Sequence, residues 1–552
     1  MKRIVIVGGV AGGMSAATRL RRLDSEAEII VLEKSGYVSY ANCGLPYFVG
    51  GVIVDEQALL LQTPQSLHDR FRLDVRVKNE VLEINRKDKR VTVIDRGSEK
   101  MYELTYDKLI LSTGASPIIP QIPGINRAHT LRTIEDVESI VSQVANSPKN
   151  AVVIGGGFIG LEIAENFVHR GIATTIVEAG AQVLAPLDTE MATILAKELQ
   201  DNGVNLHLEV SATEVTSNSV VLSDGRSLPA DLVILAIGVR PDTSIAQAAG
   251  LTIGTKGGVK VNALNLTNDS DIYAIGDMAE KIDELDGSAT LVPLANIANR
   301  HGRIVADHIA GKKVREVKTI GTAIVKVFGL TVATTGWNGK RLKATDRDFL
   351  AIHSHPNSHA GYYPDAQQMT FKLLFAPVTG EIYGAQAVGR DGVDKRIDVI
   401  ATAIRGEISA PELADLELAY APPFGSAKDP VNMLGYMAEN VISGVEQIAQ
   451  WNEIERYVNL GYQLVDVRTP NEFERGSIPG STNIPLDEIR NRLKELRGKK
   501  VLVTCQVGQR GHTAAMLLKS LGYDAVNLDG GYLLWSNSPA KFKNERKATA
   551  NV

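Results

Sequence analysis

Cysteine is the residue type with the clearest potential for chemistry in this sequence, and the 552 residues contain only two, Cys43 and Cys505. A thiol is a nucleophile only as its thiolate, so each cysteine needs surroundings that lower its pKa. Two cysteines near opposite ends of a chain argue against a disulfide framework and suit a reducing compartment. The sequence therefore predicts two separate thiol chemistries.

The segment that contains Cys43 follows a glycine-rich turn. An apolar stretch at residues 2–7 leads into GGVAGG at residues 8–13, and a helical pattern follows. Small residues let the backbone approach a pyrophosphate, which then lies at the positive N-terminus of the helix. Val10 stands where GxGxxG has its middle glycine. The next strand ends at Glu33, where a carboxylate can accept hydrogen bonds from ribose hydroxyls. We therefore expect Cys43 to lie beside a bound dinucleotide.

A second turn, GGGFIG at residues 155–160, has the full GxGxxG spacing. Its acidic residue is Glu178, and a carboxylate at this place repels a 2′-phosphate, which favours NADH and leaves NADPH as an alternative. Two mononucleotide folds in one chain are the organisation expected of a flavoprotein that receives hydride from a nicotinamide.

Length and composition set limits on the rest. At about 150 residues per domain, the length predicts three or four domains. A hydrophobic content of 44% and a charged content of 22% are typical of a soluble globular α/β protein. No apolar run approaches the roughly 20 residues that span a bilayer, and no signal-peptide pattern opens the chain, so we expect a cytoplasmic protein without membrane contact. The net charge of −5 gives no general reason to expect nucleic-acid binding.

Further motifs extend the pattern. Apolar strands end at residues 109–115 and 235–238, and DIYAIGD at residues 271–277 resembles a second flavin motif. With both glycine turns and Cys43, residues 1 to about 440 resemble the single-cysteine branch of the pyridine nucleotide-disulfide reductases, which includes coenzyme A disulfide reductases, NADH oxidases and NADH peroxidases. The resemblance implies FAD and NADH as cofactors, bound by Gly8, Val10, Ala11, Gly12, Glu33, Lys34, Asn42, Thr113, Gly114, Gly155, Gly157, Ile159, Gly160, Glu178, Gly238, Gly276, Asp277 and Ala295.

The segment from about Thr322 to Gly435 resembles the dimerisation domain of that family. AYAPPFGSAKDP, at residues 419–430, matches the segment that reaches the partner subunit's active site in coenzyme A disulfide reductases. This implies a homodimer in which Tyr420 and Lys428 act across the interface. Tyr362 is a less certain companion of Tyr420, and Tyr363 is expected to be a packed aromatic. A phenol near a thiolate can donate its O–H to a departing sulfur.

The same resemblance implies a binding site for coenzyme A, which would be substrate or a mixed-disulfide partner. Arg19 and Arg22 share one helical face and could clamp its phosphates, although a solvated basic face is the plain alternative. The implied coenzyme A residues are Ser15, Arg19, Arg22, Ser39, Asn42, Arg72 and Lys428. No metal is expected: His353, His355 and His359 lack an accompanying cysteine or arranged carboxylates, and we interpret them as surface or interface histidines.

Residues 450–540 resemble a rhodanese domain. A strand at residues 500–504 leads to Cys505-Gln506-Val507-Gly508-Gln509-Arg510, which matches the CxxGxR loop, although Ser477 stands where that family often has His. Backbone N–H groups, the dipole of the next helix and Arg510 favour a thiolate or a persulfide at Cys505. A catalytically silent docking domain is the alternative. The tail after Lys541 is expected to be disordered.

Cys43 has no second cysteine nearby, so its oxidised form must be a mixed disulfide with a small thiol or persulfide, or a sulfenic acid. The basic residues and the rhodanese-like domain favour the first. We therefore expect an NAD(P)H-dependent flavoenzyme that reduces coenzyme A persulfide or polysulfide to hydrogen sulfide through Cys43, with Cys505 supplying sulfur. The alternatives are a coenzyme A disulfide reductase or NADH oxidase with an accessory rhodanese domain, and a sulfur-binding or sensing module without turnover.

These inferences predict an α/β fold. It has two Rossmann-like domains that bind FAD and NAD(P)H, an α+β dimerisation domain and a C-terminal α/β rhodanese domain. The predicted boundaries are 1–112 and 242–320 for the FAD-binding domain, 113–241 for the NAD(P)H-binding domain, 321–445 for dimerisation, 446–460 for a linker or domain start, and 461–552 for the rhodanese domain.

Overall fold

The computed structural model describes residues 2–539, so the predicted disordered tail after Lys541 lies outside the described residues. The chain forms two compact units. The first combines the chain up to Ala181 with Gly203–Ile320, and the second combines Gln182–Asn202 with the chain from Gly321 onward. Within residues 2–539, no helix is long and apolar enough to cross a membrane.

A parallel sheet with the order β17-β7-β1-β2-β3 is the first layer of unit 1. Its strands are β1 (Arg3–Val7), β2 (Glu28–Glu33), β3 (Asp74–Val77), β7 (Lys108–Leu111) and β17 (Ile272–Ala274). Alternate residues of β1 and β2 pack into two separate cores, as a sheet covered on both faces requires.

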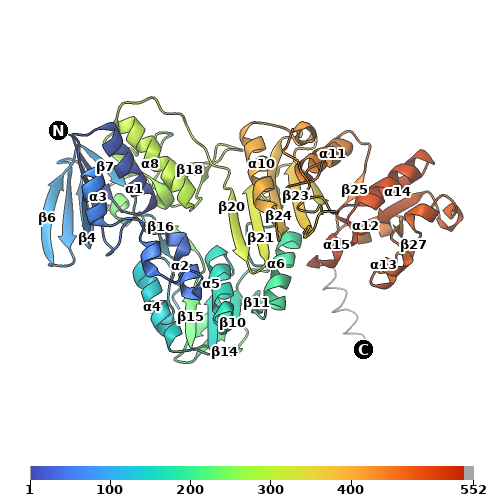
Figure 1. Ribbon diagram of the computed structural model, residues 1–552, viewed down its shortest axis with the longest axis horizontal. Coiled ribbons are helices and arrows are strands. Elements are labelled where there is room, and N and C mark those ends of the chain that lie inside the picture. Colours follow the sequence, from blue (N-terminus) through green and yellow to red (C-terminus); the bar gives the residue numbers. More distant parts are fainter. Residues whose placement is uncertain (1, 540–552) are drawn as a thin grey trace. The chain divides into compact units, whose positions relative to one another are not determined.

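One face of this sheet carries α1 (Ala11–Leu23) and α8 (Ala295–Ile309), which lie side by side (Figure 1). Their close approach depends on Gly302, where an added Cβ would lie 2.5 Å from the carbonyl oxygen of Gly12. The core on the other face includes residues of an antiparallel sheet made of β4 (Asn79–Asn85), β5 (Arg90–Asp95) and β6 (Lys100–Thr105).

The second nucleotide-binding fold of unit 1 is a parallel sheet with the order β11-β10-β9-β15. Its strands are β9 (Asn150–Ile154), β10 (Ala173–Glu178), β11 (Asn205–Leu208) and β15 (Leu232–Leu235), with α5 (Phe158–His169) after β9. The chain passes between the two folds through β8 (Ala115–Pro117) and β16 (Val239–Pro241), which pair antiparallel. The short helix α2 (Leu45–Gly50), which follows Cys43, packs on α5 and on α4 (Ile134–Ala145).

Unit 2 contains an antiparallel sheet with the order β20-β21-β24-β23-β22. Its strands are β20 (Ala323–Val327), β21 (Leu330–Gly336), β22 (Leu350–Ser354), β23 (Met369–Phe375) and β24 (Ile382–Gly389). Every residue of β23 and β24 is buried, so both faces of the sheet are covered. The helices that pack on it include α6 (Thr189–Asp201), α10 (Val393–Arg405) and α11 (Pro430–Ile442).

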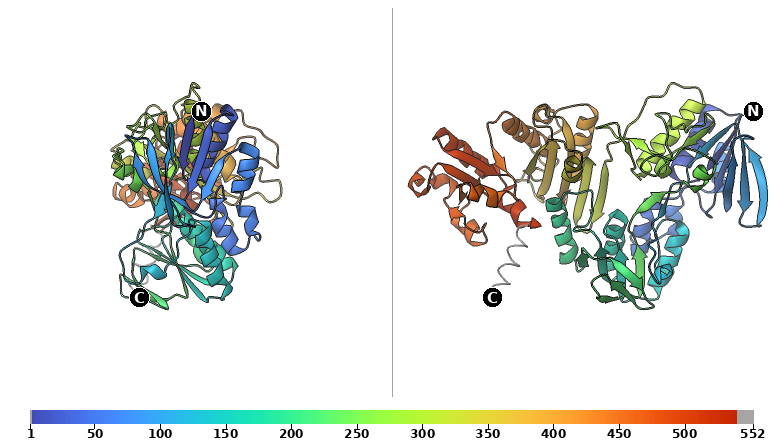
Figure 2. Two further views of the ribbon diagram at one scale, coloured as in Figure 1. Left: turned by 90° about the vertical axis from the view of Figure 1, so that its left-hand side faces the viewer. Right: turned by 180° about the vertical axis from the view of Figure 1, so that it is seen from behind.

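The C-terminal part of unit 2 is a parallel sheet with the order β25-β29-β28-β26-β27, which Figures 1 and 2 show from opposite sides. Its strands are β25 (Ile448–Ala449), β26 (Gln463–Asp466), β27 (Thr482–Asn483), β28 (Lys500–Thr504) and β29 (Asp524–Leu528). Residues of α14 (Gln509–Ser520) pack on one face, and residues of α12 (Ile454–Asn459) and α15 (Gly531–Ser536) pack on the other. The predicted fold class is therefore confirmed.

Candidate active sites

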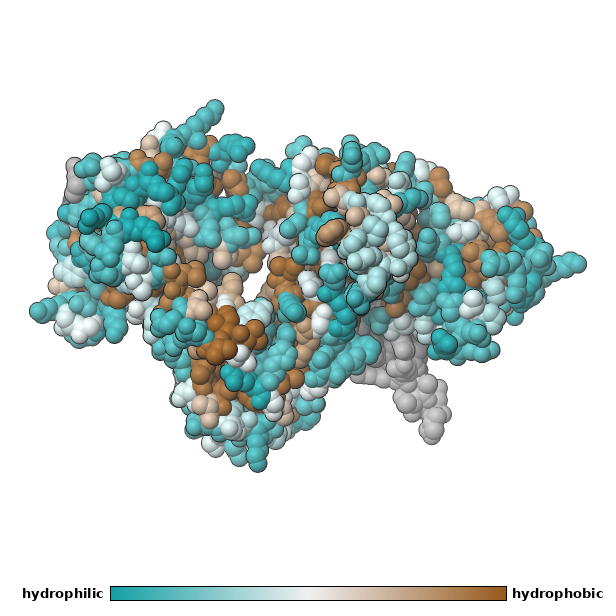
Figure 3. Space-filling view, viewed as in Figure 1, coloured by the Kyte–Doolittle hydropathy of each residue, from teal (hydrophilic) through white to brown (hydrophobic). Residues whose placement is uncertain are grey.

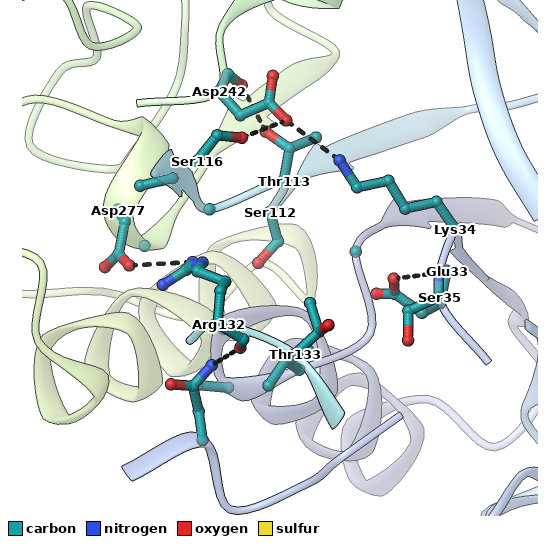
Figure 4. A pocket seen from close by; sticks show the side chains of 18 of the residues that line it. Glu33, Lys34, Ser35, Ser112, Thr113, Ser116, Arg132, Thr133, Asp242 and Asp277 are labelled. Atoms are coloured by element: carbon teal, nitrogen blue, oxygen red, sulfur yellow. Dashed lines mark hydrogen bonds and ion pairs between the residues drawn. The ribbon is translucent and has the colours of Figure 1, made fainter. Parts of the chain in front are cut away.

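The carboxyl ends of β1, β2 and β7 open onto a cavity of about 470 Å³ (Figure 4). Cys43 lines it. So do most of the predicted cofactor residues, namely Gly8, Val10, Ala11, Gly12, Glu33, Lys34, Asn42, Thr113, Gly114, Gly276, Asp277 and Ala295. The remaining ones, Gly155, Gly157, Ile159, Gly160, Glu178 and Gly238, lie at the carboxyl ends of β9, β10 and β15, around the second glycine turn.

Both glycine turns have the same steric requirements. Gly8 and Gly155 adopt φ of +101° and +110°, which favours glycine. An added Cβ on Gly13 would lie 1.9 Å from the carbonyl oxygen of Gly8, and one on Gly160 would lie 2.0 Å from that of Gly155. These positions let each helix start directly against its strand, with unpaired N–H groups of its first turn at the site.

The middle position of each turn makes no such demand. Val10 has φ −107°, outside the left-handed region, and its equivalent Gly157 has φ −82°. An added Cβ on Gly157 would meet no atom within 4 Å. The valine at position 10 is therefore compatible with a complete nucleotide-binding turn.

Glu33 and Glu178 occupy equivalent places. Glu33 accepts hydrogen bonds from the backbone N–H groups of Gly9 (2.7 Å) and Ser35 (2.8 Å). Glu178 accepts them from Gly156 (2.7 Å) and Gly180 (2.6 Å). Each carboxylate thus holds its own glycine turn, and each oxygen keeps a further lone pair that a ribose hydroxyl can reach.

Cys43 lies in the single 3₁₀ turn Asn42–Gly44, and its side chain is exposed to the cavity. The surrounding walls still remove part of its hydration, and this desolvation raises the pKa of the thiol, as do the carboxylates of Glu162 and Asp277. Arg132 acts in the opposite direction and lowers it. Cys43 therefore needs a positive partner to react as a thiolate.

No motif marked Arg132, which lies in the loop after β8 and lines the cavity. Its guanidinium is 3.5 Å from the carboxylate of Asp277 (Figure 4), and its carbonyl accepts a hydrogen bond of 2.7 Å from the side chain of Asn42. Arg132 thus connects the segment of Cys43 with Asp277. Only the folded chain brings these three segments together.

Glu162, two residues after the last glycine of the second turn, was also not predicted from the sequence. The hydroxyl of Tyr47 on α2 donates a hydrogen bond of 3.1 Å to its carboxylate. Burial raises the pKa of Glu162 to about 7, with a further contribution from Glu165, against the lowering effect of that hydrogen bond. A carboxyl group that titrates near neutral pH therefore lies next to the cysteine segment.

The residues predicted to bind coenzyme A are only partly free to do so. Arg19 pairs with Asp307 at 2.7 Å, so its charge is already compensated, whereas Arg22 is exposed. Ser15 donates a hydrogen bond of 2.8 Å to Asn299. Arg72 ends α3 (Pro64–Phe71) in a left-handed conformation. Ser39, also left-handed with φ +47°, adjoins the cysteine segment, and Lys428 belongs to unit 2.

In unit 2 the hydroxyls of Tyr362 and Tyr420 lie 3.0 Å apart and form a hydrogen bond. The two side chains are 76% and 47% exposed. The hydrogen bond raises the pKa of Tyr420. Tyr363 instead packs edge-to-face on His359. The two tyrosines predicted as companions are thus adjacent, and solvent or another molecule can reach them.

Cys505 is fully buried at the end of β28, and the N–H of Gly508 donates a hydrogen bond of 3.2 Å to its sulfur. Gly508 has φ +93°, which favours the glycine found there. Both nitrogens at the tip of the Arg510 guanidinium bind the carboxylate of Glu472, at 2.6 and 2.8 Å. This pairing lowers the pKa of Glu472 to about 2. Arg510 is therefore oriented by Glu472 beside the loop.

A second arginine of this site, Arg468, was not predicted. It is fully buried and pairs with Asp466 at 2.7 Å. It also donates a hydrogen bond of 3.1 Å to the side chain of Gln506 and lies over the ring of Tyr532, 4.1 Å from its centroid.

Of the expected surface or interface positions for His353, His355 and His359, the surface position is wrong, whereas His353 and His355 do lie at an interface, between two sheets of unit 2. All three are buried, and His353 and His355 contact Asp529 and Gly530 of the C-terminal sheet domain. The apolar strands around them exclude water, which periodicity alone does not reveal. Within residues 2–539, no cluster of three or more His, Cys, Asp or Glu side chains is arranged to hold a metal ion.

Comparisons with known proteins match three parts of the chain. The family described as pyridine nucleotide-disulphide oxidoreductase matches residues 2–302, its dimerisation domain matches residues 322–430, and a rhodanese-like domain matches residues 450–538. A coenzyme A disulfide reductase of Staphylococcus haemolyticus is 35% identical over 445 residues, which are 80% of this chain and all of that protein.

Two solved structures resemble nearly the whole chain. The reduced CoADR-RHD of Bacillus anthracis is 49% identical with a TM-score of 0.96, over 97% of this chain and 98% of that one. An NAD-dependent persulfide reductase from A. fulgidus is 34% identical with a TM-score of 0.91, over 97% and 100%. A water-forming NADH oxidase from Lactobacillus brevis, 24% identical with a TM-score of 0.77 over 81% of this chain and all of that one, shares the fold.

Proposed function

Because the chain belongs to the pyridine nucleotide-disulphide oxidoreductase family, we propose that it uses NADH and FAD to reduce the S–S bond of coenzyme A disulfide or persulfide through Cys43. The observation that carries this proposal is the place of Cys43, a free thiol in the wall of the dinucleotide cavity. The other cysteine, Cys505, is also free and is buried in unit 2. In this proposal, the oxidation partner of Cys43 is a diffusible sulfur compound and not the other cysteine of the chain.

FAD fits the cavity of unit 1. The turn at Gly8 and Gly13 accepts no side chain, which suits close approach of a pyrophosphate, and Glu33 and Asp277 offer carboxylates for hydroxyl groups. The second turn, with Glu178, would hold NADH. When bound, the flavin supplies the two electrons that NADH provides.

The protein's part of the reaction is at Cys43. Its thiolate attacks the inner sulfur of coenzyme A persulfide, the one bonded to carbon of coenzyme A. A mixed disulfide between Cys43 and coenzyme A forms, and the outer sulfur leaves as hydrosulfide, which takes up a proton. Two electrons and one proton then return the mixed disulfide to the Cys43 thiolate and free coenzyme A. Arg132 stabilises the thiolate in both steps, because it is the cation that lowers the pKa of Cys43.

The Tyr362–Tyr420 pair would supply the protons from the partner subunit of a homodimer. When one phenol donates to the other, the second keeps its own O–H for a departing sulfur. A match to the dimerisation domain and the exposure of both rings support this role. In unit 1, Val52 and Val54 follow α2 and are exposed, and Figure 3 shows hydrophobic residues gathered over α2 and α5. A partner subunit would cover such surfaces.

Cys505 would supply the persulfide. Its thiolate attacks the sulfane sulfur of a donor, the S–S bond of the donor breaks, and the rest of the donor leaves as an anion. The thiolate of coenzyme A then attacks the outer sulfur of the Cys505 persulfide, which forms coenzyme A persulfide and returns the Cys505 thiolate. The hydrogen bond from Gly508 to the sulfur and the start of α14 at this loop support an anion there.

The test is anaerobic NADH oxidation with coenzyme A disulfide, coenzyme A persulfide or polysulfide. Cys43→Ser should lose almost all activity with each substrate, and Cys505→Ser should lose only the activity that depends on a sulfur donor plus coenzyme A. Full activity of Cys43→Ser would contradict the proposal. Oxygen consumption without any sulfur compound would instead indicate an oxidase, and no turnover at all would indicate a sulfur-binding module.

A further inference from the structure

A buried cluster of five charged or titratable side chains joins four segments of unit 2. His353 on β22 and Lys372 on β23 are register partners. Asp188 and Glu190 lie at the start of α6, and Asp529 follows β29. All five side chains are less than 10% exposed. The proposed reductase and sulfur-transfer steps use none of them.

His353 lies between two carboxylates. Its Nδ1 is 2.6 Å from one oxygen of Asp529, its backbone N–H donates a hydrogen bond of 3.0 Å to the other, and its Nε2 is 3.2 Å from Glu190. A ring with a carboxylate at each nitrogen must carry both protons, so His353 is an imidazolium. Lys372 contacts Glu190 and, at 2.9 Å, Asp188.

Asp529 is attached to the backbone that supports Cys505. It leads into Gly530 and Gly531, both left-handed, with φ of +67° and +61°. The next two N–H groups, of Tyr532 and Leu533, donate to the carbonyls of Cys505 (2.7 Å) and Gln506 (2.9 Å). An added Cβ on Gly531 would lie 2.5 Å from the carbonyl oxygen of Cys505. The loop Cys505–Arg510, here called the sulfur loop, is therefore hydrogen-bonded to the segment that begins at Asp529, the residue that His353 binds.

We propose that His353 is a positioning residue for sulfur transfer at Cys505: through Asp529 it fixes the glycine pair that sets the geometry of the sulfur loop. The inference rests on the proposed role of Cys505 and extends it, because a histidine of the dimerisation domain then controls the thiol of the rhodanese-like domain. His355 adds a neutral contact, with Nε2 3.1 Å from the carbonyl of Gly530.

The charge of His353 depends on the groups around it. Asp529 and Glu190 raise its pKa, whereas burial and Lys372 oppose them, and the outcome is a raised pKa. Asp188 forms an ion pair with Lys372 and so affects His353 only indirectly. The raised pKa favours the imidazolium, and the contact with Asp529 weakens as the pH rises through the pKa of His353.

The experiment measures alkylation of Cys505 by iodoacetamide as a function of pH, in the full-length, FAD-loaded protein. Mass spectrometry of the Cys505 peptide gives the extent of alkylation, and the pH midpoint of each variant is compared with that of the wild type. His353→Gln and Asp529→Asn should each raise the midpoint by about one pH unit, because a displaced loop no longer aims the Gly508 N–H at the sulfur. His359→Gln is the matched control, a buried histidine bonded to Ser358 and Pro364, and should leave the midpoint unchanged.

An unchanged midpoint in both folded variants, or an equal shift in His359→Gln, would overturn the inference. Because Asp529→Asn keeps the shape of the side chain, it tests the idea even when His353→Gln does not fold. Incubation of the wild type with polysulfide separates the two proposals. If no sulfur atom is added to Cys505, the proposed sulfur-carrier function fails, whereas the alkylation midpoints still decide the role of His353.

Discussion

At the scale of single residues, the reactivity of Cys43 depends on three charges that lie far from it in the sequence. Desolvation, Glu162 and Asp277 raise the pKa of the thiol, and Arg132 lowers it. Glu162 is unusual because it titrates near neutral pH itself. Two acids that interact cannot both ionise freely, so the negative charge on one disfavours it on the other.

Glu162→Gln should lower the pKa of Cys43, because it removes a carboxylate that acts on the thiol. The wild-type Glu162 is mostly protonated below about pH 7 and ionised above it, so the two proteins should differ most above pH 7. The rate of Cys43 alkylation as a function of pH measures this. Tyr47→Phe is the companion variant. It removes the hydrogen bond that lowers the pKa of Glu162, so the inflection due to Glu162 should move to higher pH. Superimposable profiles for wild type and Glu162→Gln would contradict the prediction.

Arg132→Gln should have the opposite effect on the thiol. Loss of the guanidinium removes the cation that lowers the pKa of Cys43, and we expect about a tenfold slower alkylation at neutral pH, equal to about one pKa unit. Arg132→Lys keeps the charge and should recover much of the rate. Equal rates in Arg132→Gln and wild type would show that Arg132 acts only through its hydrogen bond with Asn42.

At the scale of elements, the two glycine turns place a helix N-terminus at each nucleotide site. The glycine positions within each turn differ in the space available for a side chain. A Cβ added to Gly8, Gly13, Gly155 or Gly160 would lie 1.9–2.4 Å from a backbone oxygen, whereas one on Gly157 would meet no atom within 4 Å. The turn therefore depends on its outer glycines and tolerates a side chain at its middle.

Gly13→Ala should lose FAD, because its Cβ would lie 1.9 Å from the carbonyl oxygen of Gly8 and would separate α1 from β1. Overpacking of this kind costs about 1–3 kcal/mol. The ratio of flavin to protein absorbance after purification, with the melting temperature, measures both effects. Gly157→Ala, in the second turn, meets no such contact and should keep the wild-type melting temperature. Full flavin content in Gly13→Ala would refute the steric argument.

At the scale of the whole molecule, the chain combines two compact units, each with one thiol site. The cavity with Cys43 lies in unit 1, and the Tyr362–Tyr420 pair and the Cys505 loop lie in unit 2. In the homodimer that we propose, the tyrosines of one subunit would serve the cysteine of the other, and the match to a dimerisation domain supports such a dimer.

Mixed dimers test this arrangement. Cys43→Ser and Tyr420→Phe subunits should each have low activity with coenzyme A disulfide. When they are mixed and allowed to exchange, half of the sites in each mixed dimer combine an intact Cys43 with an intact Tyr420. The mixture should then regain about a quarter of the wild-type activity, if subunits pair at random. No recovery after verified exchange would mean that Tyr420 acts within its own subunit or not at all.

The sequence by itself determined the two nucleotide-binding turns, the order of the domains and the two thiol segments. Each of these depends on residues close together in the chain, such as Gly8 to Gly13 or Cys505 to Arg510, whose spacing already implies the local backbone. Tertiary structure decided the charges that act on the thiols. Arg132 and Glu162 reach Cys43 only because α2 packs on α5 and the loop after β8 folds over the cavity. The burial of His353 between Glu190 and Asp529 likewise joins residues 163 and 176 positions away. Electrostatic effects depend on distance in space and on the exclusion of water, and folding sets both.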